Sequence, residues 1–157
     1  MRQVLVIGAG AAGMMAAIAA AEAGAKVTLL EKNEKPGKKL FITGKGRCNV
    51  TNGADMEVLF ENVVTNRKFL YSAFYQYDNR AVMELLEKAG CPLKVERGDR
   101  VFPVSDHSSD VIGALQRRLK DLGVNVRLHT KVQELLTKGT PEISASGVKL
   151  SDGKEIK

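Results

Sequence analysis

Short apolar runs alternate with glycines and with amphipathic stretches along this chain. Val4–Ile7 is an apolar run typical of a buried parallel strand, and Lys26–Glu31 has the pattern of a second short strand. Between them, Gly13–Ala23 is rich in alanine and predicts a helix that ends at Gly24. This order of strand, glycine turn, helix and strand predicts an α/β fold of the Rossmann type, with a parallel sheet and flanking helices.

The remaining pattern predicts further elements after a long polar connection. Residues 33–52 have no helical or strand period, and we expect them to be irregular. Beyond them, apolar positions recur as on one face of a helix, or alternate around turn residues as in hairpins. The predicted helices are Asn79–Ala89 and Ser109–Leu122, the strand is Val124–His129, and the hairpins are Leu93–Val104, turning at Gly98-Asp99, and Glu142–Ile156, turning at Asp152-Gly153.

The N-terminal stretch has a second interpretation. Val4–Ala21 contains no charged residue and follows Arg2, as in a signal peptide or a membrane span. The glycines at positions 8, 10 and 13 interrupt it where an apolar helix would have to be continuous. We therefore expect this stretch to form a strand and a helix, and not a signal peptide or a membrane span, and we expect the protein to be cytoplasmic.

Three glycines stand between the first strand and the helix. Gly8, Gly10 and Gly13 have the G-x-G-x-x-G spacing that gives a tight turn, a close backbone approach to a pyrophosphate, and close packing of helix on strand. The N–H groups at the helix N-terminus favour phosphate. Glu31 ends the second strand near the position expected of an acid that binds ribose hydroxyls, and its charge would repel a 2′-phosphate. The spacing favours FAD or NAD over NADP and does not separate the first two.

The fingerprint G-x-G-x-x-G-x-x-x-A-x6-G-x6-E, from Gly8 to Glu31, resembles that of the FAD-binding, GR-type two-dinucleotide flavoproteins. This resemblance implies FAD as the cofactor, with NAD(P)H as a possible co-substrate.

Composition changes the picture at one place. The hydrophobic fraction of 44% and the charged fraction of 27% exclude disordered and fibrous proteins. The net charge is +6, and the segment from Lys32 to Arg47 carries +5 of it, with six basic residues and one acidic residue. Because this segment follows Glu31 and includes Gly44 and Gly46, we expect it to lie near a cofactor pyrophosphate. A solvated lysine-rich loop is the alternative.

The string T-G-x-G-R-C-N-x-T-N at Thr43–Asn52, together with R-V-F-P-V-S-D at Arg100–Asp106, resembles the YhiN-like (BaiN/RdsA-type) family of flavin-dependent oxidoreductases. Its members have a GR-type Rossmann domain, an inserted substrate domain and a much longer chain. The resemblance covers nearly all of this sequence and implies that it corresponds to the N-terminal portion of such an enzyme. It also implies the cofactor-binding residues. Those at the pyrophosphate would be Gly8, Gly10, Ala12 and Gly13, and the one at the adenosine ribose Glu31. Those bordering the cofactor would be Lys32, Lys38, Lys39 and Leu40, those near the flavin Gly46, Arg47, Cys48 and Asn49, and the one at the adenine Val132.

No catalytic acid or base is identified from the sequence. His107 and His129 have no carboxylate or nucleophile tied to them by a motif. Cys48 and Cys91 do not have metal-ligand spacing, so we expect no metal site. Cys48 has two interpretations: a thiol made acidic by Arg47 or a helix dipole, or, in our preferred interpretation, a residue that packs or lines the cofactor.

The predicted organisation is an FAD-binding Rossmann-type domain over residues 1–137, with a long loop and inserted segment at 33–105, and a β-hairpin over 138–157. The preferred function is hydride or electron transfer through FAD to a small molecule. An NAD-binding dehydrogenase, an FAD-dependent RNA-modifying protein and an inactive fragment are the alternatives. In the RNA-modifying alternative the basic segment would bind RNA. Separately, the aromatic residues near Arg67 and Lys68 have the composition of a base-stacking surface, although their spacing fits a partly buried helix better; they are Tyr71, Phe74, Tyr75 and Tyr77.

Overall fold

The computed structural model describes residues 2–157, which form two compact units. The first unit comprises residues 2–38 and 116–157, and the second comprises residues 39–115. The chain therefore leaves the first unit once and returns to it.

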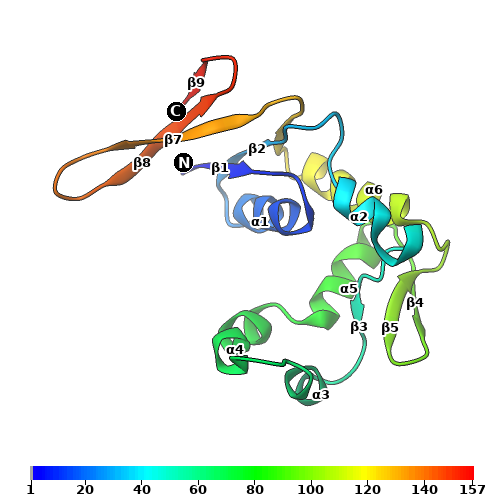
Figure 1. Cartoon of the computed structure of the whole chain (residues 1–157). Helices are drawn as coiled ribbons and strands as arrows, with labels where there is room; N and C mark the ends of the chain where they lie inside the picture. The colour runs from blue at the N-terminus through cyan, green and yellow to red at the C-terminus, as the bar shows by residue number, and fades with distance from the viewer. Residues whose placement is uncertain (1) are drawn as a thin grey trace. The chain divides into compact units, whose positions relative to one another are not determined.

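The first unit contains a parallel sheet. Its strands are β1 (Gln3–Ile7), β2 (Lys26–Leu30) and β6 (Asn125–Arg127), in the order β1-β2-β6, and β1 and β2 are labelled in Figure 1. Helix α1 (Ala11–Glu22) connects β1 to β2 as the crossover that parallel neighbours require. The parallel strands and their connecting helix confirm the predicted Rossmann-type α/β fold.

Helix α1 packs through apolar side chains on one face. Met14, Ala17 and Ile18 are buried, each at most 1% exposed. The helix ends where Gly24 adopts φ +81°, a left-handed conformation that glycine tolerates without a Cβ clash. The Gly24 N–H donates to the Ala21 carbonyl at 2.9 Å and so satisfies one of the last carbonyls of the helix.

A second, antiparallel sheet of the first unit follows β6. It consists of β7 (Val132–Lys138), β8 (Ser144–Leu150) and β9 (Glu155–Ile156). Val148 and Leu150 cluster with Leu30 of β2. The hairpin around Asp152-Gly153 was predicted, whereas β7 was not. Strand β7 was missed because its sequence, VQELLTK, does not alternate regularly between apolar and polar residues, and the strand contains two register shifts against β8.

The second unit has a three-stranded antiparallel sheet and several helices. Its strands are β3 (Thr51–Asn52), β4 (Leu93–Glu96) and β5 (Arg100–Pro103), in the order β3-β5-β4, and the hairpin of β4 and β5 turns at Gly98-Asp99 as predicted. The helices are α3 (Met56–Glu61), α4 (Arg67–Gln76), α5 (Asn79–Lys88) and α6 (Ser108–Asp121), the last continuing into the first unit. Asp78 caps α5, because its carboxylate accepts the Ala81 N–H at 2.7 Å.

The prediction that residues 33–52 are irregular is wrong. This segment contains α2 (Lys38–Ile42), the 3₁₀ turn η1 (Thr43–Gly46) and β3. Periodicity did not show them because α2 has only five residues and η1 is partly left-handed, with Gly44 and Lys45 both at φ 57°.

The aromatic cluster of the second unit lies on helices, as the spacing of its residues indicates. Tyr71 and Tyr75 of α4 contact Phe60 of α3, with ring centroids 4.6 and 6.0 Å apart. Phe60 is 7% exposed, whereas Tyr75 is 76% exposed. Phe60 is therefore the buried centre of this cluster.

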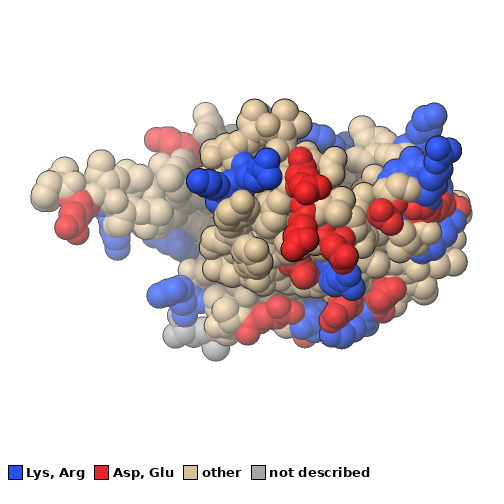
Figure 2. Space-filling model, turned by 90° about the horizontal axis from the view of Figure 1, so that it is seen from below, with Lys and Arg blue, Asp and Glu red and all other residues tan. Residues whose placement is uncertain are grey.

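Charged side chains of both signs share the face of the molecule shown in Figure 2. Asp and Glu lie beside Lys and Arg there, in keeping with a net charge that is concentrated in one segment of the sequence. Within residues 2–157, no helix combines the length and the apolar character needed to cross a bilayer.

Candidate cofactor site

The glycine turn joins the end of β1 to the start of α1. Gly8 has φ +94°, and its N–H donates to the Leu30 carbonyl of β2 at 2.7 Å. The Ala9 carbonyl accepts the Gly37 N–H at 2.8 Å, which fastens the turn to the segment after β2. The sequence predicted a tight turn at the first glycine. Gly8 has the positive φ that such a turn requires.

The second and third glycines have different surroundings. A Cβ atom on Gly13 would collide with the Gly8 carbonyl oxygen, so only glycine allows α1 to lie this close to the turn. A Cβ atom on Gly10 would meet no heavy atom within 4 Å. Packing thus explains Gly13, while the open side of Gly10 leaves room for a group outside the chain.

Helix α1 presents its first turn to solvent. Gly10 is its N-cap, and Gly10, Ala11 and Ala12 are exposed. The first hydrogen bond inside the helix is donated by Met14 to the Gly10 carbonyl at 2.9 Å. The N–H groups that precede it have no partner within the helix, and the first turn contains no acidic residue. An anion at this end is favoured by both the free donors and the helix dipole.

Glu31 follows β2 and is held by its neighbours. Its Oε2 accepts the Ala9 N–H of the glycine turn at 2.8 Å, and its Oε1 accepts two hydrogen bonds from Asn33. Its backbone continues the sheet, because the Glu31 N–H donates to Arg127 and its carbonyl accepts the Thr130 N–H. The predicted ribose-binding acid therefore lies directly beside the glycine turn.

The charge of Glu31 is maintained although its residue is only 7% exposed. Burial opposes ionisation, but the hydrogen bonds from Asn33 and Ala9, with the nearby Lys32 charge, outweigh it and hold the pKa of Glu31 below its ordinary value of 4.5. At neutral pH the group is a carboxylate that accepts hydrogen bonds and donates none.

The other predicted residues of the first unit are less enclosed. Lys32 is exposed, and Lys38 forms a 3.2 Å ion pair with Glu34 in which both side chains are about half exposed. Val132 begins β7 and pairs with Leu150. The structure brings Gly8, Gly10, Ala12, Gly13 and Glu31 together, while the roles of Lys32, Lys38 and Val132 stay predictions.

The remaining predicted residues belong to the second unit. Lys39 and Leu40 lie in α2, Gly46 is the last residue of η1, and Arg47, Cys48 and Asn49 follow η1. The Arg47 and Cys48 N–H groups donate to the Gly44 and Thr43 carbonyls, which closes this segment into a compact turn. Their predicted contacts with a cofactor stay predictions.

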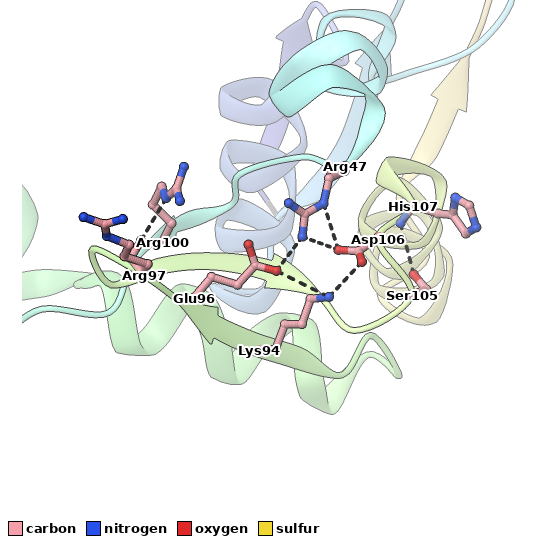
Figure 3. Close-up of polar contacts among 8 residues, drawn as sticks. All are labelled: Arg47, Lys94, Glu96, Arg97, Arg100, Ser105, Asp106 and His107. Carbon is pink, nitrogen blue, oxygen red and sulfur yellow. Dashed lines mark hydrogen bonds and ion pairs between the residues drawn. The ribbon is translucent and has the colours of Figure 1, made fainter.

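Arg47 is the centre of an ion-pair network (Figure 3). Its Nε and Nη2 donate to Asp106 Oδ1 at 2.9 and 2.5 Å, and Nη2 also donates to Glu96 Oε1 at 2.5 Å. Lys94 Nζ donates to Asp106 Oδ2 at 2.8 Å and lies 3.5 Å from Glu96. The guanidinium also lies 4.2 Å from the centre of the Phe102 ring. We call Arg47, Lys94, Glu96 and Asp106 the Arg47 network.

The Arg47 network joins three separate parts of the second unit. Lys94 and Glu96 come from β4, Asp106 follows β5, and Arg47 follows η1. Hydrogen bonds from Lys94 and Arg47 lower the pKa of Asp106, and those from Arg47 and Lys94 lower the pKa of Glu96. The sequence had marked Arg47 as a donor for a cofactor and had not indicated these partners, although Asp106 ends one of its two characteristic strings.

We expect Asp106→Asn to destabilise the protein at neutral pH and to reduce its sensitivity to acid. A carboxylate whose pKa is lowered by folding stabilises the fold above its unfolded value, here 3.8, and loses that contribution as the pH falls through the lower folded value. The asparagine variant has no such contribution to lose. Thermal unfolding between pH 3 and pH 7 measures this, with Asp121→Asn at an exposed position of α6 as the control. Parallel Tm curves for wild type and Asp106→Asn would show that ionisation of Asp106 does not stabilise the fold, and coincident curves would refute the structural role of the network.

Cys48 is not an activated thiol in this structure. The side chain is 1% exposed, and burial raises its pKa, an effect that the hydrogen bond with Thr43 only partly offsets. A nucleophilic cysteine needs the opposite shift. The structure therefore favours the packing interpretation over the acidic thiol.

The strand order, the crossover helix and the glycine turn define a Rossmann-type α/β domain. The chain belongs to the family of the HI0933-like protein Rossmann domain, whose sequence model matches residues 2–156. This membership confirms the family resemblance drawn from the strings at Thr43–Asn52 and Arg100–Asp106.

Two curated relatives support the assignment. The 3-dehydro-bile acid delta(4,6)-reductase of Clostridium scindens is 32% identical over 159 aligned residues, which cover 99% of this chain and 37% of that protein. The ribosomal RNA dihydrouridine synthase of Escherichia coli K12 is 30% identical over 133 residues, which cover 82% of this chain and 31% of that protein. The chain thus spans about a third of the length of the curated relatives it matches.

The fold also matches solved structures. The 3-ketosteroid-delta4-(5alpha)-dehydrogenase of Rhodococcus jostii RHA1 superposes with a TM-score of 0.70 over 99% of this chain and 43% of that one, at 18% identity. At this identity the likeness establishes the fold alone.

Proposed function

We propose that this chain is the FAD-binding domain of a cytoplasmic flavin-dependent oxidoreductase that transfers hydride or electrons, with NAD(P)H as the reductant. The observation that carries the proposal is the arrangement of the first unit, where a glycine turn with one open side lies against a buried carboxylate. Family membership supports the same assignment. The bound flavin would supply the redox chemistry, which amino-acid side chains do not provide.

The residues of the first unit fit the adenosine diphosphate half of FAD. The N–H groups of the exposed residues Ala11 and Ala12 suit the pyrophosphate, and the open side of Gly10 would let it approach the backbone. The Glu31 carboxylate suits a ribose hydroxyl and disfavours a 2′-phosphate. NAD has the same adenosine diphosphate group, so the choice of FAD rests on the family.

Addition of FAD to the purified chain tests the proposal. Because a ligand that binds only the folded state stabilises it, we expect the Tm to rise with FAD concentration, corresponding to about 2.7 kcal/mol at one hundred times Kd. Flavin fluorescence gives the Kd, and NAD⁺ and NADP⁺ serve as comparison ligands. If FAD leaves the Tm unchanged and NAD⁺ raises it, the chain is instead an NAD-binding dehydrogenase domain.

An RNA substrate is the second candidate, because a curated relative is named a ribosomal RNA dihydrouridine synthase. The structure gives limited support to the basic segment as an RNA-binding surface. Lys38 is paired with Glu34, and Arg47 with Asp106 and Glu96, so part of its positive charge is already neutralised. If RNA is bound electrostatically, its affinity must fall steeply with salt. A weak salt dependence would leave a small molecule as the substrate.

A further inference from the structure

Asn33 makes two hydrogen bonds to one oxygen of Glu31. Its backbone N–H donates to Glu31 Oε1 at 2.8 Å, and its side-chain Nδ2 donates to the same atom at 2.6 Å. The Asn33 carbonyl in turn accepts the His129 N–H at 3.0 Å, just beyond β6. Both the backbone and the side chain of Asn33 are thus held by hydrogen bonds, and both donate to the same oxygen of the Glu31 carboxylate.

The other oxygen of Glu31 faces the glycine turn. Oε2 accepts the Ala9 N–H at 2.8 Å. A carboxylate has about four acceptor positions, two on each oxygen. Among the described residues, the two donors of Asn33 occupy those of Oε1, and Ala9 occupies one of those of Oε2. One acceptor position is left, and it is on Oε2, beside the turn.

We propose that Asn33 is a positioning residue, which holds Glu31 Oε1 so that Oε2 is presented to a single hydroxyl of the dinucleotide ribose. This inference rests on the proposed function, because it needs a dinucleotide at the glycine turn. Asn33 itself has no hydrogen-bonding role toward the ribose. Its effect passes through the orientation and the charge of Glu31.

The electrostatics of the site agree with this geometry. Besides Asn33 and Ala9, the charged group that acts on Glu31 is Lys32, which is exposed. Asn33 contributes two hydrogen bonds to the lowering of the Glu31 pKa, one from its backbone and one from its side chain. Removing the side chain of Asn33 removes only the second.

The test is the affinity of the whole chain for FAD, measured by flavin fluorescence in Asn33→Ala, Glu31→Gln and the double variant. We expect Asn33→Ala to weaken binding about tenfold, the effect of one hydrogen bond to a charged group. In the Glu31→Gln background the same change should cost no more than about twofold, because two residues that act as a unit are not additive. Asn62→Ala is the matched control, because Asn62 is exposed and its side chain donates to the Val58 carbonyl of α3, in the second unit.

A pH series separates positioning from a general loss of structure. Without the Asn33 side chain the pKa of Glu31 rises, so the affinity for FAD should begin to fall at a higher pH than in wild type. Asn33→Asp keeps the size of the side chain and replaces the donor by a carboxylate, so it should weaken FAD more than Asn33→Ala at pH 7. The Tm of each variant shows whether it is folded.

The outcomes are distinct. If wild type does not bind FAD, the proposed function fails, and this inference fails with it. If wild type binds FAD and the two single substitutions multiply in the double variant, Asn33 acts independently of Glu31 and the inference alone is overturned. Wild-type affinity in Asn33→Asp would overturn it as well.

Discussion

Gly13→Ala is expected to destabilise the protein by more than about 3 kcal/mol, whereas Gly10→Val leaves it folded and abolishes FAD binding. The added Cβ at position 13 would collide with the Gly8 carbonyl oxygen, a backbone atom that cannot move without opening the turn. At position 10 the backbone is extended, with φ −78° and ψ −174°, and the added side chain would enter open space. That space is where the pyrophosphate should lie.

Urea unfolding and FAD titration of both variants check this pair. Because the two glycines belong to one motif, each variant is the control of the other. A Gly10→Val protein that retained FAD with wild-type affinity would show that the glycine turn is not the cofactor site. A Gly13→Ala protein of normal stability would contradict the close packing of α1 on the turn.

Glu31→Gln is expected to weaken FAD binding by about 1–3 kcal/mol, or roughly 5- to 150-fold. The Glu31 carboxylate faces three N–H donors from Ala9 and Asn33. A glutamine would place its own N–H₂ group against at least one of them, and it would lose the charge that strengthens a hydrogen bond from the ribose. Glu134→Gln, at an exposed position of β7, is the control.

The pH dependence of FAD affinity follows from the same carboxylate. The pKa of Glu31 is lowered in the folded chain, so it stays ionised from neutral pH down to its ordinary value of 4.5. Affinity should therefore be flat over this range and fall only at lower pH. Titrations at pH 7, 5 and 4 measure it, and the Glu31→Gln variant should not show the acid loss. An affinity in Glu31→Gln equal to that of wild type would remove the ribose role.

The first βαβ unit could be predicted from the sequence because its constraints are local. Three glycines at fixed spacing, an alanine-rich helix and an acid at the end of a strand leave little freedom in how the chain folds. The hydrogen bond between Ala9 and Glu31 follows from that geometry. The contacts of Asn33 could not be predicted in this way, because an asparagine two residues after a strand is common in loops and carries no signal for a particular partner.

The ion-pair partners of Arg47 could not be predicted from the sequence, for a different reason. Its partners Glu96 and Asp106 lie 49 and 59 residues away along the chain, and a pattern of single residues does not encode such pairings. The glycines around it indicated a turn, but neither the short helix α2 nor the left-handed geometry at Lys45 has a sequence period. The concentration of positive charge was visible, whereas its partial neutralisation depends on tertiary structure.

The pairing of β2 with β6 has a consequence for how this protein is made. The Glu31 N–H donates to the Arg127 carbonyl, and Thr130 donates back to Glu31, across almost one hundred residues of chain. During synthesis, residues 39–115 emerge from the ribosome before the strand that completes the sheet next to Glu31. One edge of β2, next to the glycine turn, therefore stays unpaired until residues 125–130 have been synthesised. Long-range pairing of this kind slows folding, and until it forms the unpaired N–H and C=O groups along the edge of β2 are open to pairing with another strand.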